Sequence, residues 1–529
     1  EWTLLAGDMA DARSTAFVFD GKLYLLDGAV FRSYDGKEVK PVSQSAYVPT
    51  VIISRNPDGG GTSYEALNLI GTAWKESFLG KAEVTEYQLT AVELGEEAVT
   101  AEILGEDGTW AEKTEGTDFT VDRAAGLVTF KTAPGESPVK GQDNVRITAH
   151  KAREGYADKI NRCTICTVYG VGGAEDRVFL SGNPDEPGQD WYSGFEDPTY
   201  WPDTAYTKVS RDGGAVVGYA VLGSTLATFL RGRGVGRNAV IRTGSLDEDG
   251  EALFRVTNTL LGEAPVARRS FAYLGKEPLF LTERGVYAIT AEELTGEKYT
   301  QERSYFISSA LGAIAEKEDA SASIYRDFYV LAIGGDLYLL DGQQKTYERN
   351  NPYSSYQYEA YHWPGIGARL TWVEDGVLWF GTEDGKLKEF ASHVDDPESY
   401  NDDGAAIEAY WETSDFDGKT FFKNKTFTSV SVRLAAAVLT GVKIYAQRRG
   451  IWSLVFDAKE RARFFDWSYI DFAKFVFSAD RTPRTLSGKV KIKKVDKTRF
   501  RLQNSEKNEP FGLYAFGVEW KEPGSNYKR

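Results

Sequence analysis

The hydrophobic pattern of the chain consists mainly of short apolar runs joined in pairs by tight turns. The hexapeptide Leu-Tyr-Leu-Leu-Asp-Gly occurs twice, at 23–28 and at 337–342, and each copy follows an apolar run and a turn that contains glycine. Two short apolar runs around such a turn predict a β-hairpin, because glycine readily adopts the positive φ that the turn requires. The sequence therefore predicts a hairpin that recurs.

Four looser versions of this hairpin lie at 169–182, 216–232, 270–289 and 369–390. A period of roughly 40 to 50 residues built from short strands is the size of one blade of a β-propeller. With the two hexapeptide copies, the count of hairpins is six. We therefore predict an all-β fold built on a six-bladed propeller.

Composition and charge divide the chain further. It has 529 residues, 53 of them glycine, with 42% hydrophobic and 13% aromatic residues, which indicates an all-β protein of several domains. Residues 83–122 alternate in polarity and carry twelve acidic residues and one lysine, which predicts a small acidic β-sandwich inserted between the first two blades. The predicted parts are 1–80 (propeller, first part), 81–152 (inserted acidic sandwich), 153–394 (propeller remainder), 395–404 (linker) and 405–529 (C-terminal basic sandwich).

The C-terminal part reverses the charge. Residues 419–501 contain twenty Lys and Arg against six Asp and Glu, on segments that alternate with period two. This pattern predicts a second β-sandwich or jelly roll. Within it, Lys489, Lys491 and Lys493 are expected on one face of a strand, because side chains two residues apart point the same way.

Such a row of lysines has three interpretations. It can contact nucleic acid or an acidic protein surface, it can be a solvated strand face, or it can meet the acidic insertion of a neighbouring subunit. The chain's net charge of −16 argues against a molecule that grips DNA and is compatible with a pore through which DNA slides. The candidate residues for contact with a partner or with DNA are Lys489, Lys491, Lys493, Lys494, Arg499 and Arg501.

The densest aromatic segment is 189–206, where prolines interrupt any continuous helix or central strand. Its rings can stack on carbohydrate, fill the propeller core, or contact another subunit. The candidate interface aromatics are Trp191, Tyr192, Tyr200, Trp201 and Tyr206. Elsewhere, 307–318 has helical periodicity with Ser304 as a possible cap.

No motif in the sequence predicts catalysis, a metal or a cofactor. Cys163 and Cys166 form a C-x-x-C without a second pair or a following helix, so we expect two reduced thiols on a strand. The glycine-rich segment 231–237 lacks the helix of a phosphate-binding loop, and paired carboxylates of a glycosidase cannot be singled out by spacing. No apolar run is long enough to span a membrane, and we expect no targeting segment.

Several segments resemble a family of tailed-phage virion proteins, the tail hub or nozzle family, which includes packaged-DNA stabilisation and tail tubular B-like proteins. The segment 179–209 (FLSGNPDEPGQDWYSGFEDPTYWPDTAYTKV) carries this resemblance, together with VVGYAVLGSTLATFLRG at 216–232 and FLTERGVYAI at 280–289. IEAYWETSDFDG, FDWSYIDFAKFVFS and RFRLQNSEKNEPFGLYAFGVEW, between 407 and 520, resemble the end of the same family. TDFTVDRAAGLVTFKTAPGE at 117–136 resembles small β-sandwich modules of phage tails.

The resemblance implies a non-enzymatic structural protein of a short-tailed phage virion, assembled in the host cytoplasm. Its partners would be five further copies in a homohexameric ring, the portal-adaptor ring, tail fibres or spikes, and genomic DNA that passes through the channel without sequence specificity. The ring would retain packaged DNA until ejection. The alternative is a propeller that binds or degrades glycans, and the solution mass of the chain distinguishes the two.

Overall fold

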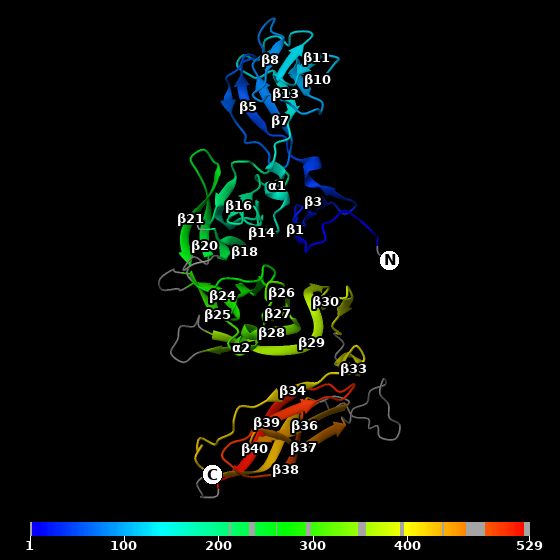
Figure 1. Cartoon of the computed structure of the whole chain (residues 1–529), viewed down its shortest axis with the longest axis vertical. Helices are drawn as coiled ribbons and strands as arrows, with labels where there is room; N and C mark the ends of the chain where they lie inside the picture. The colour runs from blue at the N-terminus through cyan, green and yellow to red at the C-terminus, as the bar shows by residue number, and fades with distance from the viewer. Residues whose placement is uncertain are drawn as a thin grey trace. The chain divides into compact units, whose positions relative to one another are not determined.

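The chain is all-β in a computed structural model that describes residues 3–210, 213–231, 239–260, 262–291, 298–347, 356–391, 396–435, 439–461 and 482–522. Figure 1 follows the chain through successive sheets, from blue at the N-terminus to red at the C-terminus. The chain divides into two units, Glu1–Lys388 and Glu389–Arg529, and each is treated by itself below. The coarse prediction of an all-β protein is confirmed.

Four sheets of the first unit are four-stranded antiparallel meanders. They comprise β1 (Thr15–Phe19), β2 (Lys22–Leu26), β3 (Phe31–Tyr34) and β4 (Val39–Pro41); β14 (Ile165–Val168), β15 (Val178–Ser181), β16 (Gln189–Tyr192) and β17 (Tyr206–Lys208); β18 (Ala215–Leu222), β19 (Thr225–Arg231), β20 (Ala239–Leu246) and β21 (Ala252–Leu260); and β22 (Ala272–Leu274), β23 (Glu277–Leu281), β24 (Val286–Ala291) and β25 (Lys298–Glu302). Four antiparallel strands joined by short turns are the unit from which propeller blades are made.

The fifth sheet differs from the expectation of two further separate hairpins. It is six-stranded, in the order β26 (Ser321–Tyr325), β27 (Phe328–Ile333), β28 (Gly335–Tyr347), β29 (Tyr356–Glu374), β30 (Val377–Thr382) and β31 (Leu387–Glu389). The hairpin predicted at 369–390 is the outer part of this sheet. The reason is β29, which pairs with β28 through its first half and with β30 through its second half.

Three pairs of neighbouring sheets in the first unit contact each other through their first strands, whereas the third and fourth meanders contact through their last strands, β21 and β25. β1 contacts β14, β14 contacts β18, and β22 contacts β26. The segment before β1 reaches farther along the chain, because Arg13 Nη1 donates to Asp319 O at 2.7 Å and Arg269 Nη2 donates to Ser14 O at 2.9 Å. These bonds join the start of the first meander to the segments that precede the fourth and fifth sheets.

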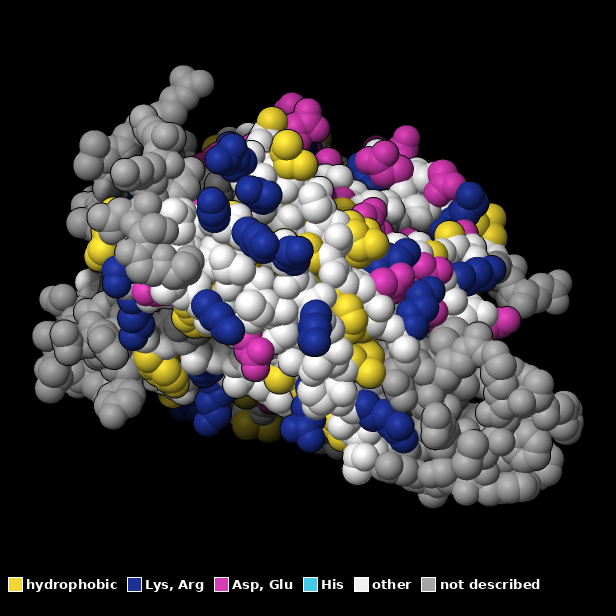
Figure 2. Space-filling view, turned by 90° about the horizontal axis from the view of Figure 1, so that it is seen from below, with side chains coloured by type: hydrophobic (Ala, Val, Ile, Leu, Met, Phe, Trp, Pro, Cys, Tyr) yellow, Lys and Arg dark blue, Asp and Glu magenta, His cyan; other side chains and the backbone are white. Residues whose placement is uncertain are grey.

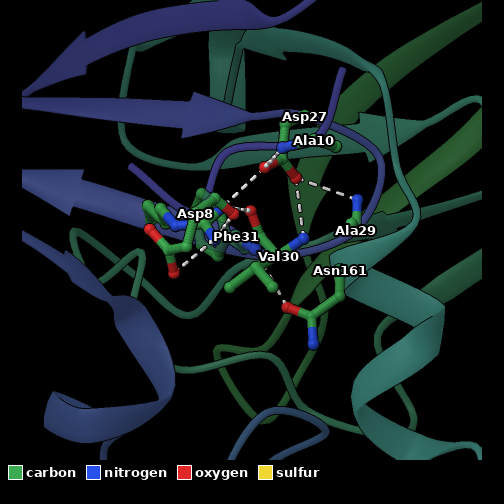
Figure 3. A network of polar contacts seen from close by, with 8 residues as sticks. Asp8, Ala10, Asp27, Ala29, Val30, Phe31 and Asn161 are labelled. Carbon is green, nitrogen blue, oxygen red and sulfur yellow. Dashed lines mark hydrogen bonds and ion pairs between the residues drawn. The ribbon is translucent and has the colours of Figure 1, made fainter. Parts of the chain in front are cut away.

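The first copy of the hexapeptide ends in a polar turn that anchors the N-terminal segment (Figure 3). The Asp27 carboxylate is buried and accepts hydrogen bonds from the backbone N–H groups of Ala10, Ala29 and Val30, at 3.1, 2.9 and 2.7 Å. It also pairs with the buried Arg32, which reaches Asp8 Oδ2 at 3.1 Å. A buried carboxylate is stable only when such partners replace water.

The inserted sandwich is larger than predicted. Its first sheet has the order β10 (Trp110–Thr114), β9 (Thr100–Leu104), β13 (Val145–His150), β7 (Ala73–Phe78), β5 (Thr50–Arg55) and β6 (Thr62–Ser63). Its second sheet is β11 (Phe119–Asp122), β12 (Leu127–Phe130) and β8 (Glu86–Gln88). Both sheets bury their inner faces in one core that includes Trp74, Phe78 and Val145.

The sandwich therefore begins before the predicted boundary at residue 81, and the prediction that 1–80 belongs entirely to the first part of the propeller does not hold for β5, β6 and β7. β5 pairs in parallel with β7, and β7 pairs with β13, so three strands before residue 81 belong to the sandwich sheet. Parallel pairing joins strands that are distant in sequence, so an alternating pattern alone does not reveal it.

Helices are few and short in the part of the chain that the structure describes. The helix predicted at 307–318 is present only as α2 (Ser308–Ala313). Ser304 does not cap this helix, and its Oγ instead accepts a hydrogen bond from Val286 N at 2.8 Å. α1 (Tyr156–Asn161) comes after the sandwich, and the 3₁₀ turns are η1 (Val42–Ser45), η2 (Val171–Gly173) and η3 (Pro397–Tyr400).

The second unit is the predicted C-terminal β-sandwich. One sheet is β34 (Ala409–Glu412), β39 (Arg499–Asn504), β36 (Leu439–Arg448) and β37 (Ile451–Arg461), and the other is β38 (Arg484–Val495), β35 (Lys425–Leu434) and β40 (Leu513–Lys521). The core between them includes Phe427, Ile444 and Phe500. A two-stranded ladder, β32 (Asn401–Asp402) and β33 (Ala405–Ala406), begins within the predicted linker.

Candidate functional site

The lysine row of β38 is exposed, as the alternating pattern predicts. Lys489, Lys491 and Lys493 are exposed, while Val490 and Ile492 between them are 8% and 6% exposed and belong to the sandwich core. Burial of each apolar side chain contributes about 1.5–3 kcal/mol, which fixes the register and holds the lysines on the outer face. Alternate residues of a strand lie about 7 Å apart, so the three charges form a regular row.

The surroundings of the row are polar and small. Lys489 lies opposite Ser429 on β35, and Ser429 lies opposite Glu519 on β40, whose carboxylate accepts from Ser429 Oγ at 2.7 Å. The next row along the face contains Ser487, Ser431 and Gly517. Within the part of the chain that the structure describes, the three lysines form no ion pair. Figure 2, seen from below, shows Lys and Arg side chains gathered over the near face.

Two of the predicted basic residues lie elsewhere. Arg499 and Arg501 are on β39, in the opposite sheet, because the chain turns at 496–498 and crosses the sandwich. Arg499 Nε pairs with Asp415 Oδ1 at 2.8 Å, and Arg501 Nε donates to Glu412 Oε1 at 2.7 Å. Their grouping with the lysine row is wrong, since carboxylates of the same unit neutralise them.

The groups around these two arginines are a carboxylate with a lowered pKa and two aromatic rings. Hydrogen bonds from Lys497 and then Arg499 hold the pKa of Asp415 below its usual range. The Arg501 guanidinium also lies over the rings of Trp452 and Tyr410, 4.6 and 5.0 Å from their centroids. Lys494 is exposed with φ of +54°, so it interrupts the alternation at the end of the row.

The aromatic segment 189–206 mostly fills the interior of the first unit. Trp191 and Trp201 are 1% and 0% exposed and pack in the core between the first two meanders, so their prediction as interface residues is wrong. Tyr192 packs against Phe254 with ring centroids 4.9 Å apart. The alternative interpretation, rings that fill the core, holds for these three residues.

The remaining two aromatics are only partly covered. Tyr200 OH donates to Ala66 O at 2.9 Å, and its ring lies 4.9 Å from that of Tyr47, so it joins the meanders to the sandwich. Burial raises the pKa of Tyr200. Tyr206 is 46% exposed and is the one member of the predicted interface set whose side chain is largely available to a partner.

A buried ion pair was not foreseen from the sequence. Asp190 and Arg242, both fully buried, pair across the second and third meanders, and Tyr219 OH donates to Asp190 Oδ2 at 3.1 Å. Burial raises the pKa of Asp190, against the opposing charge of Arg242. The available signal was the charged residue within each apolar strand, Asp190 before Trp191 and Arg242 after Ile241.

Both cysteines are free thiols. Cys163 is buried and Cys166 is partly buried, and burial raises the pKa of both thiols. Among the residues that the structure describes, no group of three His, Cys, Asp or Glu side chains could hold a metal ion. The glycine-rich segment lies outside them, except for Arg231.

No family model matches the chain, and no curated protein matches it. PorZ, a surface component of the type-IX secretion system of Porphyromonas gingivalis, is similar with a TM-score of 0.28 and 11% identity, over 90% of this chain and 59% of that one. An exo-β-1,3-galactanase from Phanerochaete chrysosporium is similar with a TM-score of 0.19 and 10% identity, over 98% of each chain. The chain thus spans less than two thirds of the PorZ chain, and likeness at this level assigns no function.

Helices long and apolar enough to cross a membrane are not found among the residues that the structure describes.

Proposed function

We propose that the chain is a structural virion protein of a short-tailed phage, a tail hub or nozzle subunit in a homohexameric ring around the DNA channel below the portal-adaptor. The sequence resemblance to that family supports this proposal. The observation that carries it is the exposed lysine row of β38, which no carboxylate neutralises within the described part of the chain. The ring would retain packaged DNA and support fibres or spikes.

The charge distribution suggests how the ring is held together. The inserted sandwich is strongly acidic, whereas the lysine row is basic, so one subunit offers two complementary surfaces. Contacts between unlike surfaces of neighbouring copies generate a closed ring when the rotation closes. An edge strand rich in lysine also resists edge-to-edge aggregation. The test must distinguish this simpler function of the lysine row from a function in ring assembly.

Closure into a six-bladed propeller is part of the proposal, with the outer part of the six-stranded sheet acting as the sixth blade beside the four meanders and the inner part of that sheet. The contacts among first strands and the bonds from Arg13 and Arg269 support it, because a propeller brings its inner strands together around an axis. Closure also suits the wall of a channel, since a closed arrangement leaves few free sheet edges.

The test is the mass of the purified chain in solution, alone and with its candidate adaptor ring, across a range of salt concentrations. We expect a hexamer in at least one condition. Reversal of charge at the row (Lys489→Glu, Lys491→Glu and Lys493→Glu together) should weaken assembly, most at low salt, because exposed charges are screened beyond about 10 Å at 0.1 M salt.

The matched control reverses three exposed lysines of the first unit, Lys22, Lys37 and Lys276. It changes the net charge equally and should assemble like the parent chain. A monomer in every condition would contradict the hexamer, and equal loss in both triple variants would show that net charge, not the row, controls assembly.

The alternative, a glycan-binding protein, has one observation of its own. Tyr410 and Trp411 on β34 are 58% and 48% exposed, and exposed rings can stack on sugars. The buried Trp191 and Trp201 no longer support it. Retention of a polysaccharide by a persistent monomer, abolished in Tyr410→Ala, would favour this alternative.

A further inference from the structure

Five arginines from separate segments of the first unit surround Glu318 and Asp319, just before β26. Arg13 Nη1 lies 3.4 Å from Asp319 Oδ1, and Arg369 Nη2 lies 4.0 Å from Asp319 Oδ2. Arg231 pairs with Glu318. Arg268 and Arg269 lie beside them, and we define the arginine cluster as Arg13, Arg268, Arg269 and Arg369.

Two members of the cluster have only neutral partners in the part of the chain that the structure describes. Arg268 Nη1 donates to Thr164 Oγ1 at 2.6 Å, and Arg269 Nη2 donates to Ser14 O at 2.9 Å. Because Ser14 directly follows Arg13 in the chain, Arg269 lies close to Arg13. Burial lowers the pKa of Arg269, and the nearby charges of Arg13 and Arg268 lower it further despite Asp319.

One atom of the cluster lacks a partner among the residues that the structure describes. Arg13 Nη2 is buried and makes no hydrogen bond with them, although Nη1 of the same guanidinium bonds Asp319 O. A buried donor without an acceptor is costly, and such groups in native proteins usually have a bound water, ion or ligand as partner. This atom therefore marks a place where an acceptor is expected.

The charges do not balance within the cluster. Five arginines face only two carboxylates within the described part of the chain. Glu318 pairs with Arg231 and also acts on Arg268, whereas Asp319 is shared by Arg13, Arg269 and Arg369. Like charges at short range destabilise one another unless an anion lies among them. The site is open to that anion, because the side chains of Arg369 and Asp319 are 48% and 73% exposed.

We propose that the arginine cluster binds a small multivalent oxyanion of the phosphate class, held by Arg13, Arg268 and Arg269. Planar guanidinium groups match the paired oxygen atoms of phosphate, and several together suit a multivalent anion better than a single carboxylate. The anion supplies the missing acceptor of Arg13 Nη2. It also joins the N-terminal segment to the segment before β22, so binding stabilises the first unit. This proposal does not depend on the proposed function.

The test measures binding of sodium tripolyphosphate to the full chain by calorimetry, at constant ionic strength set with sodium chloride. We expect saturable binding and a rise in melting temperature with tripolyphosphate, stronger than with sulfate. Arg269→Gln should weaken binding about 10- to 100-fold, the range expected for one lost hydrogen bond to a charged group. The control Arg255→Gln removes an exposed arginine of β21 and should bind like the parent chain.

Two further variants show whether a loss of binding results from misfolding. Arg369→Gln changes a half-exposed residue at the rim and should weaken binding less than Arg269→Gln, with the far-ultraviolet spectrum unchanged. Arg269→Lys keeps the charge but loses the planar pair of N–H donors of the guanidinium, so its affinity should lie between those of the parent and Arg269→Gln. Absence of saturable binding, or equal affinity of Arg269→Gln and Arg255→Gln, would overturn the proposal.

The source of the phosphate is settled in the same experiment by a nucleoside triphosphate. Affinity equal to that for tripolyphosphate identifies a site that recognises the phosphate groups alone. Higher affinity identifies a nucleotide whose base or ribose adds contacts. Tighter binding of sulfate than of tripolyphosphate would contradict recognition of multivalent phosphate.

Discussion

The two copies of Leu-Tyr-Leu-Leu-Asp-Gly have the same six residues and different structures. In the first copy β2 ends at Leu26, and Asp27 and Gly28 form a turn in which Gly28 has φ of +79°. In the second copy β28 continues through Asp341 and Gly342 to Tyr347. Asp341 pairs with Glu359 of β29 across the sheet.

The cause of the difference is the sequence on the C-terminal side of each copy. After the first copy, Val30 and Phe31 lead at once into β3, which requires a tight reversal. After the second copy, the polar run 343–347 extends the strand against the long β29. The apolar half of the hexapeptide specifies a buried strand in both places, whereas the Asp-Gly step adopts the conformation that its neighbours impose.

The largest expected effect separates the two aspartates. Asp27→Ala removes three backbone hydrogen bonds and the partner of the buried Arg32, so it should lower the free energy of unfolding by about 3–5 kcal/mol. Asp341 accepts one local bond, from Gln343 N at 2.9 Å, so Asp341→Ala should cost about 1 kcal/mol. Denaturant unfolding of both variants measures the difference, and equal losses would show that the two turns contribute alike.

A smaller effect is a different order of stability of the alanine and asparagine variants at the two glycines. Gly28 needs the left-handed conformation, which costs an alanine about 1–2 kcal/mol and asparagine less, so Gly28→Asn should be more stable than Gly28→Ala. Gly342 lies outside the left-handed region, but a Cβ there would lie 2.8 Å from Asp327 O.

At this second position the backbone oxygen has to move for any side chain, at a cost of about 1–3 kcal/mol. The larger asparagine gains nothing there, so Gly342→Asn should be no more stable than Gly342→Ala. Thermal unfolding of the four variants gives the two rank orders. The same order at both positions would contradict distinct roles for the two glycines.

The hexapeptides also show how far the sequence predicts the fold. Local alternation predicted the hairpins and the lysine face. From Lys489 to Ile492, the period of two alone decides which side chains face solvent and which face the core. It did not predict which strands share a sheet: β5 joins the sandwich through a parallel pair with β7. It also left open whether Trp191 and Trp201 fill the core or form an interface, since their burial depends on a core assembled from two meanders.

The charged sites were the least predictable, for the same reason. Arg499 meets Asp415 across 84 residues of sequence, and Arg13 meets Asp319 across 306. A count of basic residues along one strand records neither pairing. The sequence therefore revealed charges that lie exposed on a regular strand, and it missed those whose partners come from elsewhere in the fold.

The smallest expected effect is a pH dependence of the turn in the first copy. Burial disfavours the charged form of Asp27, but hydrogen bonds from Val30, Ala10 and Ala29 and the charge of Arg32 outweigh it, so its pKa in the folded chain is lowered. A lowered folded pKa contributes stability above the unfolded value of about 3.9, and this contribution is lost as pH falls through the folded pKa. Between pH 6 and pH 3, roughly the window around that value, Asp27→Asn should therefore lose less unfolding free energy than the parent chain does. Asp341→Asn serves as the matched control for the loss of a carboxylate at the same step of the hexapeptide. Parallel curves for the parent and Asp27→Asn would mean that the carboxylate of the first turn carries no charge-dependent stability, and that the two turns differ in geometry alone.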